Sequence, residues 1–524
     1  MAVLENSMLD DEKPEIAHSE AESAERQHQV IDYNRDSFLP RPSSDPRDPL
    51  NWALSLKIAV LVQVSLLAAL GTLNTAIVNP AYAKLAEELD ISIVQASYQT
   101  TVTIAINGVG PFLWIPLANV YGRRPIYLFT TLLGFASILG SAYAQTYAQL
   151  IGARIVNGLF PAAMALGPST IVDCFFFHQR GRATGLFTVL LTTGAHIAPI
   201  VGGLVGQFLG WRWTFKLAAI MDGFMFLVIL FGLPETLYIR THDSLTRSAP
   251  TDSREREAPT LGWKTYLASL APYAGPFPGL KLHPSDFVLP ALRMAKYPSV
   301  LFPAAYYGAQ YGFGSILPAV TVAAIFSERF GWDTLEIGLA YGGALTVGGV
   351  LGEFFAGMVL DALVKRTRHR LGGGNPEPEA RLVAIWTGAV ALPAGLLIYG
   401  FTIQYRVHWF VPLFGMGLAC FGLQPVATTC YTYSIDCYRE RGGDVATLFN
   451  FIRQSFGMTF AFYVVLLSQK IGYQFAFVLF VVWGSVLGFL PIIVLMFKGR
   501  QIREWCEKRD EGKRNAESKP SEST

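Results

Sequence analysis

The chain has 524 residues, 52% of them hydrophobic and only 15% charged, with a formal net charge of +2. Soluble proteins carry about 25% charged residues, so the composition argues against a soluble globular protein and for one embedded in a membrane. The small net charge gives no basis for nucleic-acid binding. Four of the five cysteines lie in or at the ends of apolar runs. We expect them to act as small hydrophobic residues, and we predict no disulfide, metal site or cofactor.

Apolar runs of roughly 20 residues or more follow a polar N-terminal region, and each is long enough to cross a bilayer as a helix. Twelve are predicted, at 57–80, 93–119, 125–144, 147–173, 181–208, 213–233, 298–326, 335–363, 381–402, 408–433, 445–468 and 473–498. We therefore predict an all-α membrane protein with two six-helix bundles. The predicted regions are a disordered cytosolic tail (1–56), the N-terminal bundle (57–233), a cytosolic central loop (234–297), the C-terminal bundle (298–498) and a cytosolic C-terminal tail (499–524).

Basic residues in the short loops predict the orientation of these helices. Eleven lie in loops on one side, among them Arg123 and Arg180, and five lie on the other side, among them Lys84 and Arg212. Cytoplasmic loops carry an excess of Lys and Arg. Both termini and the central loop are therefore expected in the cytosol.

The two halves resemble each other where their fourth spans end. Asp173-Cys-Phe leads to Arg180-Gly in the first half, and Asp436-Cys-Tyr leads to Arg441-Gly in the second. Many transporters are built from such repeats, with the substrate site between the repeats near the middle of the membrane. The pattern therefore predicts an internal duplication and a central site.

Four ionisable side chains are expected at membrane depth, where a charge costs about 3 kcal/mol or more. They are Arg154 in span four, His196 in span five, Asp222 in span six and Glu353 in span eight. Arginine stays charged in proteins, so Arg154 can favour a nearby carboxylate or bind an anionic group. The carboxyl groups and the imidazole can carry protons. We predict that these four residues couple transport to protons.

Each of the four also has a purely structural interpretation. Arg154 could extend to the lipid headgroups, and Asp222 could be a protonated carboxyl bonded to neighbouring backbone. Glu353 could be a helix-packing carboxylate tied to the Asp361 end of its helix, as the alternative to a proton or cation site. His196 could be a neutral packing histidine.

Polar side chains in other spans are expected to line a cavity between the halves. The predicted lining residues are Asn74, Asn107, Gln310, Tyr311 and Gln424. The chain is 13% aromatic, and a cavity that combines amides with aromatic rings suits a large amphipathic organic molecule.

Another group of residues is predicted to control conformational change. Small residues let helices approach closely, and Pro199 can kink its helix because it lacks a backbone N–H. Asp173 and Asp436 are expected to form salt bridges with nearby arginines, and Arg453 to pair with Asp361 or Asp436. The predicted set is Gly122, Arg123, Arg124, Asp173, Arg180, Gly194, Pro199, Gly202, Gly203, Asp361, Asp436 and Arg453.

Several of these segments match known motifs. Residues 116–124, Pro-Leu-Ala-Asn-Val-Tyr-Gly-Arg-Arg, resemble the signature of the major facilitator superfamily between spans two and three. Arg154-x-x-x-Gly158 resembles its fourth-span motif linked to proton coupling, and Gly194-x-x-x-Ala-Pro-x-x-Gly-Gly203 its fifth-span antiporter motif. Asp48-Pro-Leu-Asn-Trp52 and Pro234-Glu-Thr236 are similar to segments of the fungal twelve-span drug:proton antiporter branch. The resemblance covers about residues 45–500.

The chain departs from the family motifs at four positions, one of which is the Gly near the start of the signature, where it has Ile115 or Pro116. Asn119 stands where the signature has Asp, Val120 where it has Arg, and Ala198 where the fifth-span motif has Gly. The resemblance therefore implies a weakened charged latch between spans two and eleven in the first half.

The resemblance implies proton-coupled export of an organic small molecule, such as a drug, toxin or secondary metabolite, by alternating access. The expected partners are the substrate, protons and the lipid bilayer of a fungal plasma membrane, and the expected form is a monomer. A proton symporter for a polyamine or another organic cation remains open, with Asp222 and Glu353 as cation ligands. A nutrient sensor and a membrane enzyme are less favoured, since the C-terminal tail is short and neither a phosphate-binding loop nor a catalytic constellation occurs.

Overall fold

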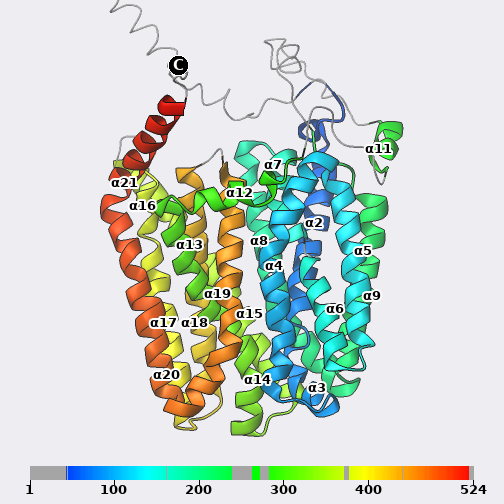
Figure 1. Ribbon diagram of the computed structural model, residues 1–524, viewed down its shortest axis with the longest axis vertical. Helices are drawn as coiled ribbons and strands as arrows, with labels where there is room; N and C mark the ends of the chain where they lie inside the picture. Colours follow the sequence, from blue (N-terminus) through cyan, green and yellow to red (C-terminus); the bar gives the residue numbers. More distant parts are fainter. Residues whose placement is uncertain are drawn as a thin grey trace, which may run out of the picture.

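The computed structural model describes residues 43, 45–160, 162–238, 262–271, 282–370, 377–438 and 441–517. Across these ranges the chain is built from helices and contains no strand (Figure 1). Twelve helical segments are long and apolar enough to cross a membrane, which confirms the predicted number of spans and the all-α fold. The predicted N-terminal tail lies almost entirely outside the described residues, as does much of the predicted central loop.

The first six spans form the N-terminal bundle. A short turn, η2 (Pro49–Asn51), precedes them, and the Asp48 side chain caps it by accepting from the Leu50 N–H. The helices are α2 (Leu54–Ala76) with η3 (Asn79–Ala81) and α3 (Tyr82–Glu88), α4 (Ile93–Tyr121), α5 (Arg123–Ala142), α6 (Tyr147–Leu159) with α7 (Ala162–Cys174), α8 (Phe177–Phe208) and α9 (Trp211–Gly232).

The last six spans form the C-terminal bundle. Two short helices of the central region precede them, α11 (Trp263–Ser269) and α12 (Ser285–Met294). The spans are α13 (Pro298–Tyr311) with η4 (Gly312–Ile316) and α14 (Leu317–Phe330), α15 (Thr334–Arg370), α16 (Glu379–Leu382) with α17 (Ile385–Gln404), α18 (Phe410–Cys437), α19 (Gly442–Ile471), and α20 (Tyr473–Phe480) with η6 (Val481–Leu487) and α21 (Gly488–Glu517).

Breaks in the helices fall within five spans, one of which is span nine, divided between α16 and α17. Span one changes to the 3-10 turn η3 at Pro80, which has no N–H to continue the α-helical bonding. Span four is divided between α6 and α7. Spans seven and twelve contain the π-helical turns η4 and η6, a conformation often found at functional sites. Backbone groups freed at such breaks need other partners inside a membrane.

Both described ends of the chain lie at the same end of the molecule, which we call the termini face (Figure 1). This is the arrangement that an even number of spans requires. The two bundles stand side by side and meet along two helix pairs, α8 with α15 and α4 with α19. Exposed large apolar side chains occur on spans of both bundles, for example Phe231 and Phe354, as expected for surfaces that contact lipid.

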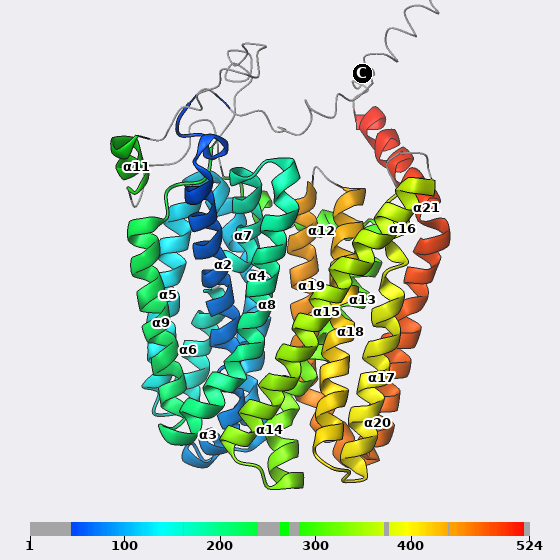
Figure 2. The ribbon, with the colours of Figure 1, turned by 180° about the vertical axis from the view of Figure 1, so that it is seen from behind.

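The α8–α15 pair is not equally close along its length. Near the end opposite the termini face, a Cβ built on Gly203 would lie 2.7 Å from the Cα of Gly338. Towards the termini face the helices are farther apart. A Cβ built on Gly181, Gly185 or Gly357 would have no atom of a neighbouring segment within 4 Å. Figure 2 shows the two helices together in the lower part of the molecule and separating towards the top. The bundles are therefore sealed on this side at the opposite face and separated at the termini face.

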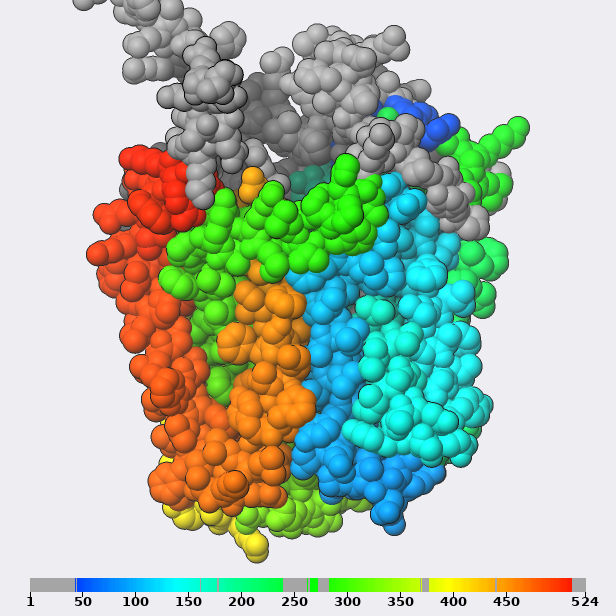
Figure 3. Space-filling model, in the orientation of Figure 1, coloured from blue at the N-terminus to red at the C-terminus, as the bar shows by residue number. Residues whose placement is uncertain are grey.

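Two helical segments at the termini face lie outside the predicted spans. Helix α12 packs against both α4 and α19, and Figure 3 shows it as a green band across the junction of the two bundles. Helix α21 continues to Glu517 rather than ending at residue 498. Its extension is anchored by Arg503, which donates to Glu379 at 2.9 Å, and by Asp510, which accepts from Lys296 at 3.1 Å.

Candidate functional site

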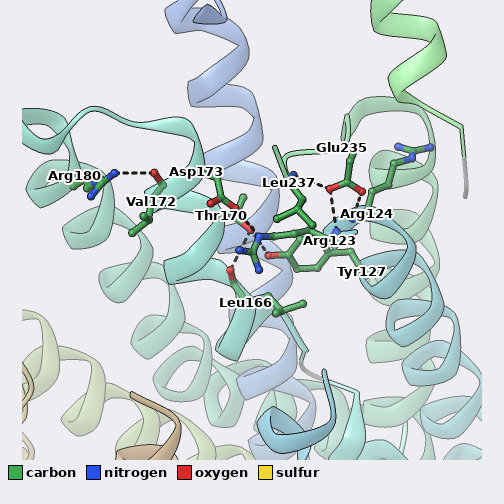
Figure 4. Close-up of polar contacts among 10 residues, drawn as sticks. All are labelled: Arg123, Arg124, Tyr127, Leu166, Thr170, Val172, Asp173, Arg180, Glu235 and Leu237. Atoms are coloured by element: carbon green, nitrogen blue, oxygen red, sulfur yellow. Dashed lines mark hydrogen bonds and ion pairs between the residues drawn. The ribbon is translucent and has the colours of Figure 1, made fainter. Parts of the chain in front are cut away.

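A cluster of charged side chains organises the turn between spans two and three (Figure 4). Gly122 has φ +99°, in the region that favours glycine, and it both ends α4 and begins α5. The Arg123 Nε donates to the Asp173 Oδ2 at 2.6 Å and links α5 to the end of α7. Arg180 donates to the carbonyls of Phe175 and Val172 at the same end of span four. Gly122, Arg123 and Arg180 thus tie three helix ends together.

Glu235 completes this cluster from the segment that follows span six, at the same end of the bundle. Its two carboxylate oxygens accept the backbone N–H groups of Arg123 at 2.9 Å and Arg124 at 3.1 Å, so it caps the N-terminus of α5, where negative charge is favoured. Burial raises the pKa of the Glu235 carboxyl, while the backbone donors of Leu237, Arg123 and Arg124 act in the opposite direction. Three backbone N–H groups therefore hold the carboxylate between spans three and six.

The Arg124 guanidinium binds carbonyl groups at the C-termini of two helices. It donates to the carbonyls of Ile229, Leu230 and Leu233 at the end of α9. It also donates to the carbonyls of Leu270 at 2.6 Å and Ala271 at 3.3 Å, just after α11. A cation is favoured at the negative end of a helix. Arg124 therefore fixes α11, part of the central region, to the N-terminal bundle.

Replacing Arg124 is expected to release α11. In Arg124→Lys a single ammonium cannot bridge two helix ends as the planar guanidinium does, and hydrogen bonds to charged groups contribute about 1.5–3 kcal/mol each. We expect amide hydrogen exchange at residues 266–271 to accelerate by about tenfold or more, as measured by mass spectrometry. Lys264→Ala, on the exposed face of α11, should leave this exchange unchanged. Equal protection in Arg124→Lys would show that other contacts hold the helix.

The second bundle repeats part of this arrangement. Asp436, at the end of α18, pairs with Arg381 of α16 at 3.0 Å, just as Asp173 at the end of span four pairs with an arginine at the start of the preceding span. Arg453 lies farther inside α19, and its described contacts differ from the predicted pairing with Asp361 or Asp436. Its Nη2 donates to the Asn450 Oδ1 at 2.8 Å. Asp361 is exposed on α15.

A second polar network lies buried inside the N-terminal bundle. The Arg154 side chain is fully buried and donates to the carbonyls of Asn74 at 3.0 Å and Thr75 at 3.2 Å. These carbonyls belong to the last turn of α2, directly before the break in span one. The guanidinium also bonds Asn157 and lies 5.4 Å from the centre of the Phe215 ring. Arg154 therefore points into the bundle and not towards lipid headgroups.

Asp222 is joined to Arg154 through Asn74. The Asn74 Nδ2 donates to the Asp222 Oδ2 at 2.7 Å, while the backbone carbonyl of Asn74 accepts from Arg154. Asp222 is fully buried, and within the described residues its Oδ1 has no hydrogen-bond partner and its carboxyl forms no ion pair. An ionised carboxylate in such surroundings carries a large desolvation cost. Three spans thus hold a carboxyl, an amide and a guanidinium in one chain of contacts.

His196 and Glu353 lie apart from this network. The His196 Nε2 is 3.7 Å from the Cys420 Sγ of α18, and its ring would meet a Cβ on Gly349 of α15 at 2.5 Å. It therefore packs at the junction between the bundles. Glu353 is only partly buried, one turn nearer the termini face on α15, and has no ion pair among the described residues.

The small residues of span five face two different neighbours. A Cβ on Gly194 or Gly202 would meet α2 or the residue after it, at 2.3 Å from the Ala69 carbonyl oxygen and 1.7 Å from the Ile77 carbonyl oxygen. Gly203 instead meets Gly338 in the other bundle, whose own added Cβ would lie 2.5 Å from the Pro199 carbonyl oxygen. The motif therefore packs span five inside its own bundle and also seals the junction.

The predicted cavity residues are distributed over several environments. Gln310 donates to the Gly484 carbonyl at 2.9 Å and accepts from Ser485, so it faces span twelve inside the C-terminal bundle. The Asn107 carbonyl accepts from Asn450 across the junction at 3.2 Å. Gln424 packs against Gly352 of span eight, with 2.9 Å between its Cγ and an added Cβ. Tyr311 lies beneath the Arg453 guanidinium, 4.5 Å from ring centre to Cζ.

Comparisons with known proteins agree with this architecture. The sequence profile of the Major Facilitator Superfamily matches residues 64–462. The MFS transporter fsa7 of Fusarium sp. is 30% identical over 456 residues, covering 86% of this chain and 84% of its own length. The efflux pump radE of Floropilus chiversii is 25% identical over 469 residues, 88% and 83% of the two chains.

A solved structure shares the fold. It is a bacterial homologue of the human lysosomal transporter Spinster in an inward-facing, unoccupied conformation. It covers 84% of this chain and 98% of its own, with a TM-score of 0.57 and 14% sequence identity. The twelve spans, the two bundles and the family match over most of the chain lead to one assignment. The protein belongs to the major facilitator superfamily.

Proposed function

We propose that the protein is a proton-coupled secondary transporter that exports an organic small molecule by alternating access. The buried chain of contacts from Arg154 through Asn74 to Asp222 carries this proposal. Intramembrane ionisable residues are costly and typically mark ion or proton pathways. Neither charged group has an oppositely charged partner in direct contact among the described residues.

The junction between the bundles supports alternating access. At the opposite face, Gly203 and Gly338 bring α8 and α15 into backbone contact, whereas the same helices separate towards the termini face (Figure 2). Rocking one bundle against the other around a central site would exchange the sealed and separated ends. Because basic loops favour a cytosolic termini face, this conformation would be open to the cytosol.

Coupling would use Asp222 as the proton carrier and Arg154 as a fixed charge. A proton on the carboxyl removes the desolvation cost of its ionised form. The fixed guanidinium, relayed by Asn74, favours release of that proton when the site is reached by water. If the proton binds in one conformation and is released in the other, the conversion between the two conformations would be driven in one direction.

Export is supported by the names of the relatives, and we propose the plasma membrane as the location. Several fungal homologues are named efflux pumps, among them radE and FUB11 of Gibberella fujikuroi, the latter 29% identical over 411 residues. The positions of Lys and Arg in the loops support cytosolic termini. The proposed small partners are the substrate and protons, and the proposed form is a monomer in the bilayer.

Flux in proteoliposomes with an imposed pH gradient tests the proposal. Export by antiport predicts that substrate accumulates on the more acidic side, opposite to proton flow, and that a protonophore abolishes the accumulation. Movement of substrate in the same direction as protons would instead identify a symporter, as expected for uptake of an organic cation. Accumulation that does not depend on the pH gradient would reject proton coupling.

A further inference from the structure

Arg453 is a partly buried cation that the proposed coupling does not use. It lies in the middle of α19, and its Nε has no hydrogen-bond partner among the described residues. Its described contacts are Asn450, the Tyr311 ring at 4.5 Å and the neighbouring Tyr307 side chain. No Asp or Glu within the described chain pairs with it. Arginine has five N–H donors, and here the one on Nε has no acceptor among the described residues.

Aromatic rings surround this guanidinium on one side. Tyr307 and Tyr431 have ring centres 5.4 Å apart, and Tyr431 and Phe449 are 4.6 Å apart. Tyr311, which carries the guanidinium, ends α13 directly before the π-helical turn η4. We call Arg453, Tyr307, Tyr311, Tyr431 and Phe449 the Arg453 cluster. It combines a planar cation with ring faces and edges from spans seven, ten and eleven.

The Arg453 cluster adjoins the junction between the bundles. Asn450, one turn from Arg453, donates to the Asn107 carbonyl of α4 at 3.2 Å. Gln454, the next residue, packs against Gly108, whose added Cβ would lie 2.9 Å from it. Arg453 and Tyr311 nevertheless keep part of their surface exposed. Both side chains therefore keep accessible surface beside the contact between α4 and α19.

We infer that the Arg453 cluster recognises the anionic end of the substrate, and that the substrate is a planar organic anion such as an aromatic or conjugated carboxylate or enolate. A carboxylate fits the guanidinium fork with two parallel hydrogen bonds, and a flat conjugated body fits between aromatic rings. An organic cation would meet an uncompensated positive charge there. This inference rests on the proposed transport function and names its substrate class.

Binding to the purified full-length protein tests the inference with three probes of one size: 2-naphthoate, 2-naphthamide and 2-naphthyltrimethylammonium. We expect 2-naphthoate to bind at least tenfold more tightly than the other two in competition with radiolabelled 2-naphthoate. Arg453→Gln should remove this preference, and Arg453→Lys should keep part of it, since it keeps the charge but not the fork. Arg329→Gln is the matched control, because Arg329 also lies over a tyrosine, 5.4 Å from the centre of the Tyr473 ring, but at the opposite face.

Several outcomes overturn the inference. It fails if wild type does not bind 2-naphthoate, if it binds the amide or the cation as tightly, or if Arg453→Gln, eluting as a monodisperse protein, binds 2-naphthoate as wild type does. The same probes in proteoliposomes separate this failure from failure of the proposed function. Uphill movement of the cation driven by a pH gradient would keep the function and reject the anion site. Arg453-dependent binding without any gradient-driven flux would reject the function and keep the site.

Discussion

Asp222→Asn is expected to abolish substrate accumulation driven by a pH gradient while leaving downhill exchange of substrate intact. The amide keeps the size of the carboxyl, and its oxygen can still accept from the Asn74 Nδ2, which donates to the Asp222 Oδ2 at 2.7 Å. What it loses is the ability to bind and release a proton. Because the packing is preserved, the loss should be confined to coupling.

The expected loss of accumulation is large because the pH gradient determines how far the wild-type protein can concentrate its substrate. A pH difference of two units supplies about 2.7 kcal/mol per proton, enough for an accumulation of about 100-fold with one proton per substrate. In Asp222→Asn this ratio should fall to about one. Proteoliposomes with an acidic lumen measure the ratio, and exchange of labelled for unlabelled substrate without a gradient measures the residual activity.

Two comparisons make the result interpretable. Asp286→Asn changes an exposed carboxylate on α12 and should leave accumulation as in wild type. Glu353→Gln tests the other carboxyl in a span, which no described ion pair fixes. If Asp222→Asn still accumulates substrate in a pH-dependent way, while Glu353→Gln does not, the proton carrier is Glu353 and the buried network is structural.

The fold followed from the sequence because hydrophobic runs long enough to cross a bilayer leave few alternatives. The paired Asp-Cys segments likewise indicated a repeat, and the ion pairs of Asp173 with Arg123 and of Asp436 with Arg381 occupy corresponding positions. The partners themselves were not predictable from proximity in sequence. Each arginine comes from the preceding span, whose start lies beside the end of span four or ten only in the folded bundle.

Contacts of charged side chains with backbone groups were the main feature that could not be predicted from the sequence. Glu235 appeared only as part of a family segment, yet its carboxylate caps α5, about 110 residues away. Arg154 binds carbonyls in the last turn of α2, beside the break at Pro80. A proline within an apolar run was the available signal, since it frees backbone acceptors that a buried cation can satisfy. Arg453 was expected near carboxylates because its depth in α19 could not be judged from its neighbours.

Adding a side chain at Gly203 is expected to open the seal at the opposite face. An alanine Cβ would lie 2.7 Å from the Gly338 Cα and 3.0 Å from the Thr334 carbonyl oxygen, and both are backbone atoms that cannot rotate away. Overpacking of this kind costs about 1–3 kcal/mol. A two-state equilibrium then shifts by about 5- to 150-fold. Gly203→Ala should therefore populate the conformation open at the opposite face and slow transport.

Accessibility of a single reporter cysteine measures this shift. Thr334→Cys places the thiol at the sealed end of α15, where Thr334 is 5% exposed. A membrane-impermeant maleimide added from the opposite face should label it at least fivefold faster in the Gly203→Ala background. Gly343→Ala is the matched control, because a Cβ there meets no atom within 4 Å. Gly202→Ala is unsuitable, since its Cβ would clash with Ile77 within its own bundle. Unchanged labelling and transport in Gly203→Ala would mean that the backbone contact between α8 and α15 is not the seal.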